Sequence, residues 1–205
     1  MENIHLILHL LRYNICHNTP IYARKQFFTR AYKARNTKKN KEMRGYATMI
    51  KILFICHGNI CRSPMAEFVM KDLVKKAGIE DQVFIASAAT SSEEIWRGVG
   101  NPVYPPAREE MALHGISCDG KRAVQMTAED YDKYDLLIGM DDNNMRNMKR
   151  IAGGDPEGKM HKMTEYIGNS YDVADPWYTG NFKETWRDIS MSCQGLLEHL
   201  LTELN

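Results

Sequence analysis

Residues 52–64 read ILFICHGNICRSP, and they carry the strongest structural signal in this chain. The four apolar residues before Cys56 are typical of a buried strand, and Pro64 suits the first position of a helix. Between these elements, Gly58 and Asn59 tolerate positive φ angles, so the backbone can turn tightly and bring several N–H groups together. The sequence therefore predicts a strand, a short loop and a helix in direct succession.

The predicted loop combines groups that together bind a phosphoryl group. Converging amides and the positive end of the helix attract an oxyanion, and the Arg62 guanidinium can donate two parallel hydrogen bonds to it. The same field favours the thiolate form of Cys56. A cysteine after an apolar strand is more often a small buried hydrophobe, but here an arginine follows after five intervening residues. We predict that Cys56 is a nucleophile in a phosphate-binding loop with His57, Gly58, Asn59, Ile60, Cys61, Arg62 and Ser63.

A second motif, Asp175-Pro176-Trp177-Tyr178, suits the departure of an aryl group from phosphate. The leaving oxygen needs a proton, and a carboxyl group held in a dry cleft can supply it. Pro176 biases Asp175 towards an extended backbone, while Trp177, Tyr178 and the more distant Trp96 offer aromatic walls for a phenyl ring. Trp96 could equally be packed core, and an Asp-Pro pair alone is an ordinary turn signal. Combined with the phosphate-binding loop, the motif predicts Asp175 as a general acid.

From Met49 onward, stretches typical of strands alternate with stretches typical of helices. We expect strands at 51–55, 83–88, 134–140 and 159–163, and helices at 64–77, 105–114, 141–151 and 181–201. A further helix is expected to start at Thr127, whose side chain would cap it. The alternation predicts an α/β fold: a single three-layer domain with a four-stranded parallel sheet and helices on both faces. The phosphate-binding loop after the first strand then lies at the carboxyl edge of the sheet, where such folds bind ligands.

Charge divides the chain at Met49. Residues 1–48 contain ten Lys or Arg and two acidic residues, so the remaining 157 residues carry 17 basic against 24 acidic side chains. The apolar patch near the start is too short to span a membrane and lacks the features of a secretory signal. We predict that residues 1–48 are a basic extension, either disordered or upstream of a natural start at Met49, with an organellar transit peptide as the alternative. Residues 49–205 are predicted to form the catalytic domain.

The loop and several downstream segments resemble the low-molecular-weight protein tyrosine phosphatase family. The resemblance covers about three quarters of the chain. It is carried by residues 50–70, Ser87-Ala88-Ala89-Thr90, Gly100-Asn101-Pro102, His114-Gly115-Ile116 and Asp175-Pro176-Trp177-Tyr178.

The resemblance implies hydrolysis of phosphotyrosine through a phosphocysteine on Cys56, without a metal or cofactor. Arg62 would bind the phosphoryl oxygens, and Asp175 would act first as acid and then as base. The resemblance also implies that Asn59 and Ser87 brace the loop, and that Cys61 can trap oxidised Cys56 as a disulfide. From its position, Ser63 could donate its hydroxyl to the Cys56 sulfur, with turn chemistry as its ordinary alternative.

Other functions on the same scaffold stay open. Related protein-arginine phosphatases carry Thr where this chain has Ile60, which favours phosphotyrosine. Arsenate reductases need a closely spaced cysteine pair, whereas Cys118 and Cys193 are far apart. A zinc site at Cys56, His57 and Cys61 lacks a fourth ligand. A phosphate-binding or thiol redox sensor without turnover is the non-catalytic alternative. Lys121 stands where many family members place a His that supports the loop.

The expected partner is a phosphotyrosine-containing protein or a small aryl phosphate. We expect no nucleic-acid or membrane partner, and a monomer or weak dimer. The five cysteines include no CxxC pair, and with no export signal this pattern favours reduced thiols in the cytoplasm.

Overall fold

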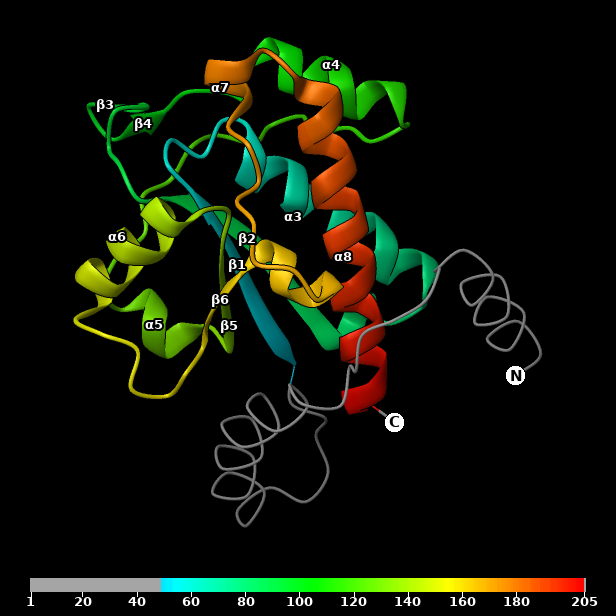
Figure 1. Ribbon diagram of the computed structural model, residues 1–205. Coiled ribbons are helices and arrows are strands. Elements are labelled where there is room, and N and C mark those ends of the chain that lie inside the picture. Colours follow the sequence, from blue (N-terminus) through cyan, green and yellow to red (C-terminus); the bar gives the residue numbers. More distant parts are fainter. Residues whose placement is uncertain (1–48, 205) are drawn as a thin grey trace.

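The computed structural model describes residues 49–204, so the prediction for residues 1–48 lies outside the described part. The centre of the fold is a four-stranded parallel sheet in the order β2-β1-β5-β6 (Figure 1). The strands are β1 (Ile50–Cys56), β2 (Val83–Ala89), β5 (Leu136–Gly139) and β6 (Met160–Lys162). The predicted α/β architecture and all four predicted strands are confirmed.

Helices cover both faces of the sheet, as predicted. On one face, α3 (Arg62–Lys76), α4 (Pro105–Leu113) and α8 (Phe182–Leu204) pack together. On the other face lie α5 (Asp130–Lys133) and α6 (Asp142–Ala152), as Figure 1 shows. Alternate residues of β1 serve the two layers: Phe54 belongs to the core under α3 and α8, and Ile55 to the core under α6. A strand buried on both faces needs a continuous apolar run, which β1 has.

Several short elements complete the described chain. A two-stranded antiparallel hairpin is formed by β3 (Ile95–Trp96) and β4 (Val99–Gly100), and α7 (Pro176–Thr179) follows Asp175. Two 3₁₀ helices, η2 (Glu80–Gln82) and η3 (Met163–Ile167), precede β2 and follow β6. The sequence did not predict these elements. The prediction of a Thr127 cap was wrong: α5 begins at Asp130, whose carboxylate instead accepts a hydrogen bond from the Thr127 amide at 2.8 Å.

The position of β1 in the sheet determines where the predicted phosphate-binding loop lies. Its neighbours β2 and β5 lie on opposite sides, and the chain crosses from one side to the other after β2, so the carboxyl end of β1 is the switch point at which sheets of this kind bind ligands. The loop after β1, the Met140-Asp141 turn after β5 and the segment 168–175 all follow carboxyl ends of the sheet. These three segments supply the residues described below.

Gly195 lets α8 pack closely against η3. A Cβ atom at this position would lie 2.3 Å from the Tyr166 carbonyl oxygen and 2.9 Å from its carbon. Alanine normally favours a helix over glycine by about 1 kcal/mol, but a collision with backbone forces the two elements apart at a cost of about 1 to 3 kcal/mol. We therefore expect Gly195→Ala to lower the free energy of unfolding in a urea titration. The exposed neighbouring change Gln194→Ala should leave it unchanged or raise it, and a Gly195→Ala protein as stable as the parent would contradict this packing.

Within residues 49–204, no helix has the length and apolar character needed to cross a membrane.

Candidate active site

The loop between β1 and α3 places Cys56 at its base. The Cys56 sulfur lies 3.0 Å from the Ser63 hydroxyl and accepts a hydrogen bond from the Asn59 amide at 3.3 Å. The Asn59 amide and the N-terminus of α3 behind the loop both direct positive partial charge at this point, as an anion-binding loop requires. The side chain is 3 % exposed, so this sulfur is sheltered and held in one position.

One local prediction for this loop, the helix position of Pro64, was wrong, and Gly58 has a role other than a positive φ. Only Asn59 of the expected pair has a positive φ, at 59°. Gly58 is needed for space instead, because a Cβ there would lie 2.9 Å from Cγ of Glu94. The helix begins at Arg62, so Pro64 is its third residue rather than its first. At that position proline still removes no intrahelical hydrogen bond, since the first turn has free N–H groups in any case.

Asn59 connects the loop to β2 and to the chain beyond it. Its side-chain amide donates to the hydroxyls of Ser63 at 2.9 Å and Ser87 at 2.8 Å. Its carbonyl oxygen accepts from the Val124 amide at 3.0 Å. The left-handed backbone of Asn59 is thus held by three hydrogen bonds from one side chain, which fixes the amide that points at Cys56.

A buried carboxylate supports Ser87 in turn. Glu67 of α3 accepts from the Ser87 hydroxyl at 2.5 Å and pairs with Lys121 at 2.8 Å and Lys71 at 2.5 Å. Lys121 also donates to the Ser87 carbonyl at 3.1 Å, so a lysine does reach the loop support at this position. Burial would raise the pKa of Glu67, but Lys121, Lys71 and Ser87 together lower it. The carboxylate is therefore ionised at neutral pH and holds the Ser87 hydroxyl as its donor.

Lys121 is the less exposed of the two lysines that pair with Glu67, and its replacement should loosen the loop. We expect Lys121→Met to lower kcat by on the order of 10-fold, because misplacing a reacting group by a fraction of an ångström is costly. Lys76→Met is the matched control, since Lys76 makes only an exposed pair with Asp72 on the same helix. The pKa of Glu67 lies below its ordinary value of 4.5, so this support should persist above pH 4.5 and fail only in stronger acid. Equal kcat values in the two variants would show that Lys121 does not support the loop.

Arg62 lies almost fully buried at the start of α3, between two acidic segments. One nitrogen, Nη1, donates to Oδ2 of Asp141 at 2.6 Å and to the Val173 carbonyl at 3.1 Å. The other, Nη2, donates to Oδ2 of Asp175. Burial would lower the pKa of Arg62, but Cys56 and Asp175 raise it. The guanidinium is thus permanently charged and oriented from two sides.

The predicted acid motif, Asp175-Pro176-Trp177-Tyr178, lies at the start of the short helix α7. Asp175 caps α7, and its Oδ1 accepts from the Trp177 amide at 3.1 Å. The structure therefore brings the Asp175 carboxylate to Arg62, 113 residues away in sequence. Tyr104, which the sequence reading missed, packs its ring 5.1 Å from that of Trp177, and its amide donates to the Ile60 carbonyl at 2.9 Å. Tyr104 thus joins the acid motif to the phosphate-binding loop.

The predicted aromatic walls are all solvent-exposed. Trp177 is 56 % exposed, Tyr178 84 % and Trp96 75 %, which rules out the reading of Trp96 as packed core. Trp96 lies on β3, where the Arg97 guanidinium is 5.8 Å from its ring. The segment before this hairpin contacts the loop, since Glu93 pairs with His57 at 2.9 Å.

The remaining loop residues are held inside. Ile60 and Cys61 are both buried. Burial, followed by the neighbouring Cys56 and Asp175, raises the pKa of Cys61 well above its ordinary value. The two loop cysteines therefore differ: Cys61 is a protonated thiol, whereas Cys56 has the Asn59 amide directed at its sulfur. Cys118 and Cys193 are likewise free thiols, and among residues 49–204 no cluster of three His, Cys, Asp or Glu side chains is arranged to hold a metal ion.

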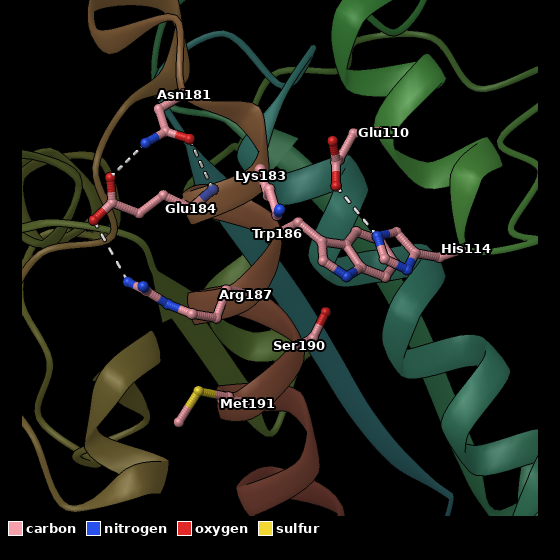
Figure 2. Close-up of a pocket in the computed structure, with 9 residues that line it drawn as sticks. All are labelled: Glu110, His114, Asn181, Lys183, Glu184, Trp186, Arg187, Ser190 and Met191. Atoms are coloured by element: carbon pink, nitrogen blue, oxygen red, sulfur yellow. Dashed lines mark hydrogen bonds and ion pairs between the residues drawn. The ribbon is translucent and has the colours of Figure 1, made fainter.

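A cavity of about 550 Å³ lies elsewhere, between the end of α4 and the first half of α8. Figure 2 shows the rings of His114 and Trp186 stacked in its wall, and their centroids are 4.0 Å apart. His114 also contacts Glu110 at 3.2 Å. None of the residues that line this cavity belongs to the phosphate-binding loop or the acid motif, so it is separate from the candidate active site at the carboxyl edge of the sheet.

Comparison with known proteins agrees with this geometry. The model of the family "Low molecular weight phosphotyrosine protein phosphatase" matches residues 51–205. Among curated proteins, the low molecular weight protein-tyrosine-phosphatase YfkJ of Bacillus subtilis is 38% identical over 157 residues, which are 76% of this chain and 98% of YfkJ.

Solved structures show the same relationship. The crystal structure of YfkJ superposes with a TM-score of 0.73 at 37% identity, covering 78% of this chain and all of the other. The low molecular weight protein tyrosine phosphatase SP-PTP of Streptococcus pyogenes gives 0.65 at 38% identity, covering 74% and 93%. The drosophila arginine phosphatase DARP gives 0.66 at 28% identity, covering 74% and 98%. With its loop, its buried arginine and its capping aspartate on one sheet edge, this chain belongs to the low-molecular-weight phosphotyrosine protein phosphatase family.

Proposed function

We propose that this phosphatase works through a phosphocysteine formed on Cys56. The thiolate attacks phosphorus as the P–O bond to the aryl group breaks, and the phosphoryl group moves to sulfur. Arg62 and the loop amides stabilise the equatorial oxygens, as donors fixed in advance do most effectively. The observation that carries this proposal is the position of the Cys56 sulfur at the base of an anion-binding loop, where it accepts from the Asn59 amide and lies 3.0 Å from the Ser63 hydroxyl.

Asp175 is proposed to serve both steps. In the first step it gives its proton to the leaving phenolate, and in the second it accepts a proton from the water that attacks the phosphocysteine. In the free enzyme its carboxylate oxygen contacts the Arg62 guanidinium. The phosphoryl oxygens compete for the same guanidinium, so substrate binding releases the Asp175 carboxyl group and allows it to take up a proton.

The substrate is proposed to be phosphotyrosine. Exposed Trp177 and Tyr178 next to Asp175 suit a phenyl ring, and Ile60 contributes no hydroxyl to the loop. The similarity to an arginine phosphatase makes phosphoarginine the second candidate. Hydrolysis of a phosphotyrosine peptide and a phosphoarginine peptide should be compared at equal concentration in EDTA. We expect kcat/KM to favour phosphotyrosine, and a preference for phosphoarginine would reverse the assignment.

Arsenate reduction is disfavoured by the other thiols. A thiol relay needs thiolates, but burial raises the pKa of both Cys118 and Cys193. Cys193 lies in α8, where its sulfur faces the Ala66 carbonyl at 3.7 Å. Both therefore fit a packing role better than a relay.

Cys61 is proposed, from the family resemblance, to protect the nucleophile. Peroxide would oxidise the Cys56 thiolate to a sulfenic acid, and the Cys61 thiol would then form a disulfide with it and release water. A nucleophile with this chemistry stays active only in a reducing compartment, which supports the cytoplasm as its location. We further propose that the enzyme acts as a monomer or weak dimer.

A further inference from the structure

Lys162 is a buried lysine that no step of the proposed chemistry uses. It is the last residue of β6, at the carboxyl edge of the sheet, and is 8 % exposed. Its ammonium nitrogen lies 2.5 Å from Oδ1 of Asp142, 2.7 Å from Oδ1 of Asp172 and 2.8 Å from the Ser170 carbonyl. All three protons of the ammonium group thus have an acceptor.

The partners of Lys162 belong to the two segments that hold Arg62. Asp142 follows Asp141, the cap of α6 that accepts from Nη1 of Arg62. Asp172 precedes Val173, whose carbonyl accepts from the same nitrogen. One lysine therefore connects the turn after β5 with the segment that leads to Asp175.

Direct bonds between these two segments complete the arrangement. The Asp142 amide donates to Oδ1 of Asp172 at 3.2 Å, and the Val173 amide donates to the Met140 carbonyl at 2.9 Å. Without the ammonium group, the carboxylates of Asp142 and Asp172 would face each other with like charge. The segments would then lose the cation that connects them beside Arg62, which donates to both of them.

We propose that Lys162 is a positioning residue for catalysis: it clamps the Asp141-Asp142 turn to the segment 170–175 and so sets the direction of the Arg62 guanidinium and the Asp175 carboxyl group. It contacts neither substrate nor reacting atoms. The inference rests on the proposed roles of Arg62 and Asp175. We therefore expect that replacing Lys162 weakens phosphate binding and leaving-group protonation, in addition to any loss of stability.

Lys159, the residue directly before β6 and three positions before Lys162, provides a matched control. It is also a buried lysine, but its ammonium group reaches the Tyr131 carbonyl at 3.0 Å and Glu157 at 3.3 Å, under α5. Lys159→Met and Lys162→Met make the same chemical change at the two ends of β6. Only the second touches the segments around Arg62.

The experiment compares the parent, Lys162→Met, Lys162→Arg and Lys159→Met on aryl phosphates whose phenols rise in pKa, with inorganic phosphate as a competitive inhibitor. For Lys162→Met we expect kcat to fall by on the order of 10- to 10²-fold, most for the poorest leaving groups, and the phosphate inhibition constant to rise. Lys162→Arg should recover part of both losses. Lys159→Met should lower the melting temperature while keeping the parent's leaving-group dependence and phosphate affinity.

Two results would overturn the positioning role: unchanged kinetics in Lys162→Met, or a loss in Lys162→Met that matches Lys159→Met across all leaving groups. If Lys162→Met does not fold, Asp172→Ala tests the same clamp from its half-exposed end and should shift leaving-group dependence and phosphate affinity in the same direction. A parent enzyme without aryl phosphatase activity would instead refute the proposed function.

Discussion

Cys56→Ser protein is expected to show no measurable turnover and yet to bind inorganic phosphate nearly as well as the parent. A serine hydroxyl stays protonated at neutral pH and is a poor nucleophile for phosphorus. The Asn59 amide, the helix end and Arg62 are all unaltered by the change, so the anion site remains. Stopped assays with p-nitrophenyl phosphate give the first quantity, and isothermal titration with phosphate gives the second.

Arg62→Lys is the contrasting variant, because it should lose binding as well as turnover. Lysine is a point charge on a flexible stem and cannot orient as Arg62 does between Asp141 and Asp175. Appreciable turnover in purified Cys56→Ser protein, or parental phosphate affinity in Arg62→Lys protein, would contradict the assigned roles.

The second large effect is expected for Asp175→Asn, which should slow hydrolysis of aryl phosphates by on the order of 10²- to 10⁴-fold. Asparagine can still cap α7 through its side-chain oxygen, so the fold of the acid motif should survive. The loss should grow as the leaving phenol becomes more basic, since a good leaving group needs little protonation. A plot of log kcat/KM against phenol pKa should be steep for the variant and shallow for the parent.

The pH profile gives an independent check on the acid. The parent should lose activity on the basic side as Asp175 gives up its proton, and this limb should flatten in Asp175→Asn. Asp172 is the nearest alternative acid in sequence, but its Oδ1 already accepts from Lys162 and from the Asp142 amide. Equal slopes against phenol pKa, or a basic limb that persists in the variant, would move the role away from Asp175.

The sheet and the phosphate-binding loop could be predicted because their signals are local. The apolar run of β1, buried on both faces, and the Cys-to-Arg spacing each lie within a few consecutive residues. Element ends were less certain. The helix starts at Arg62 rather than Pro64, because the loop backbone turns into α3 as soon as it has passed the anion site.

The partners of the site residues could not be predicted, because they come from distant parts of the chain. Nothing near Asp141 in sequence indicates that it contacts Arg62, 79 residues away. The resemblance marked Lys121 as a position of loop support, but its partner Glu67 becomes visible only when α3 and the chain beyond α4 are packed together. The β3–β4 hairpin was missed since its turn has Arg97-Gly98 at positive φ, where Asn-Gly is the usual signal.

The most direct test of this account is to trap the covalent intermediate. Parent enzyme mixed with an excess of aryl phosphate in EDTA should be quenched in alkaline denaturant within one turnover, digested at alkaline pH and mapped by mass spectrometry. The account predicts one phosphoryl group per chain, on Cys56, and none in Cys56→Ser protein treated alike. Rapid turnover with no phosphorylated cysteine, or a phosphoryl group on another residue, would contradict it.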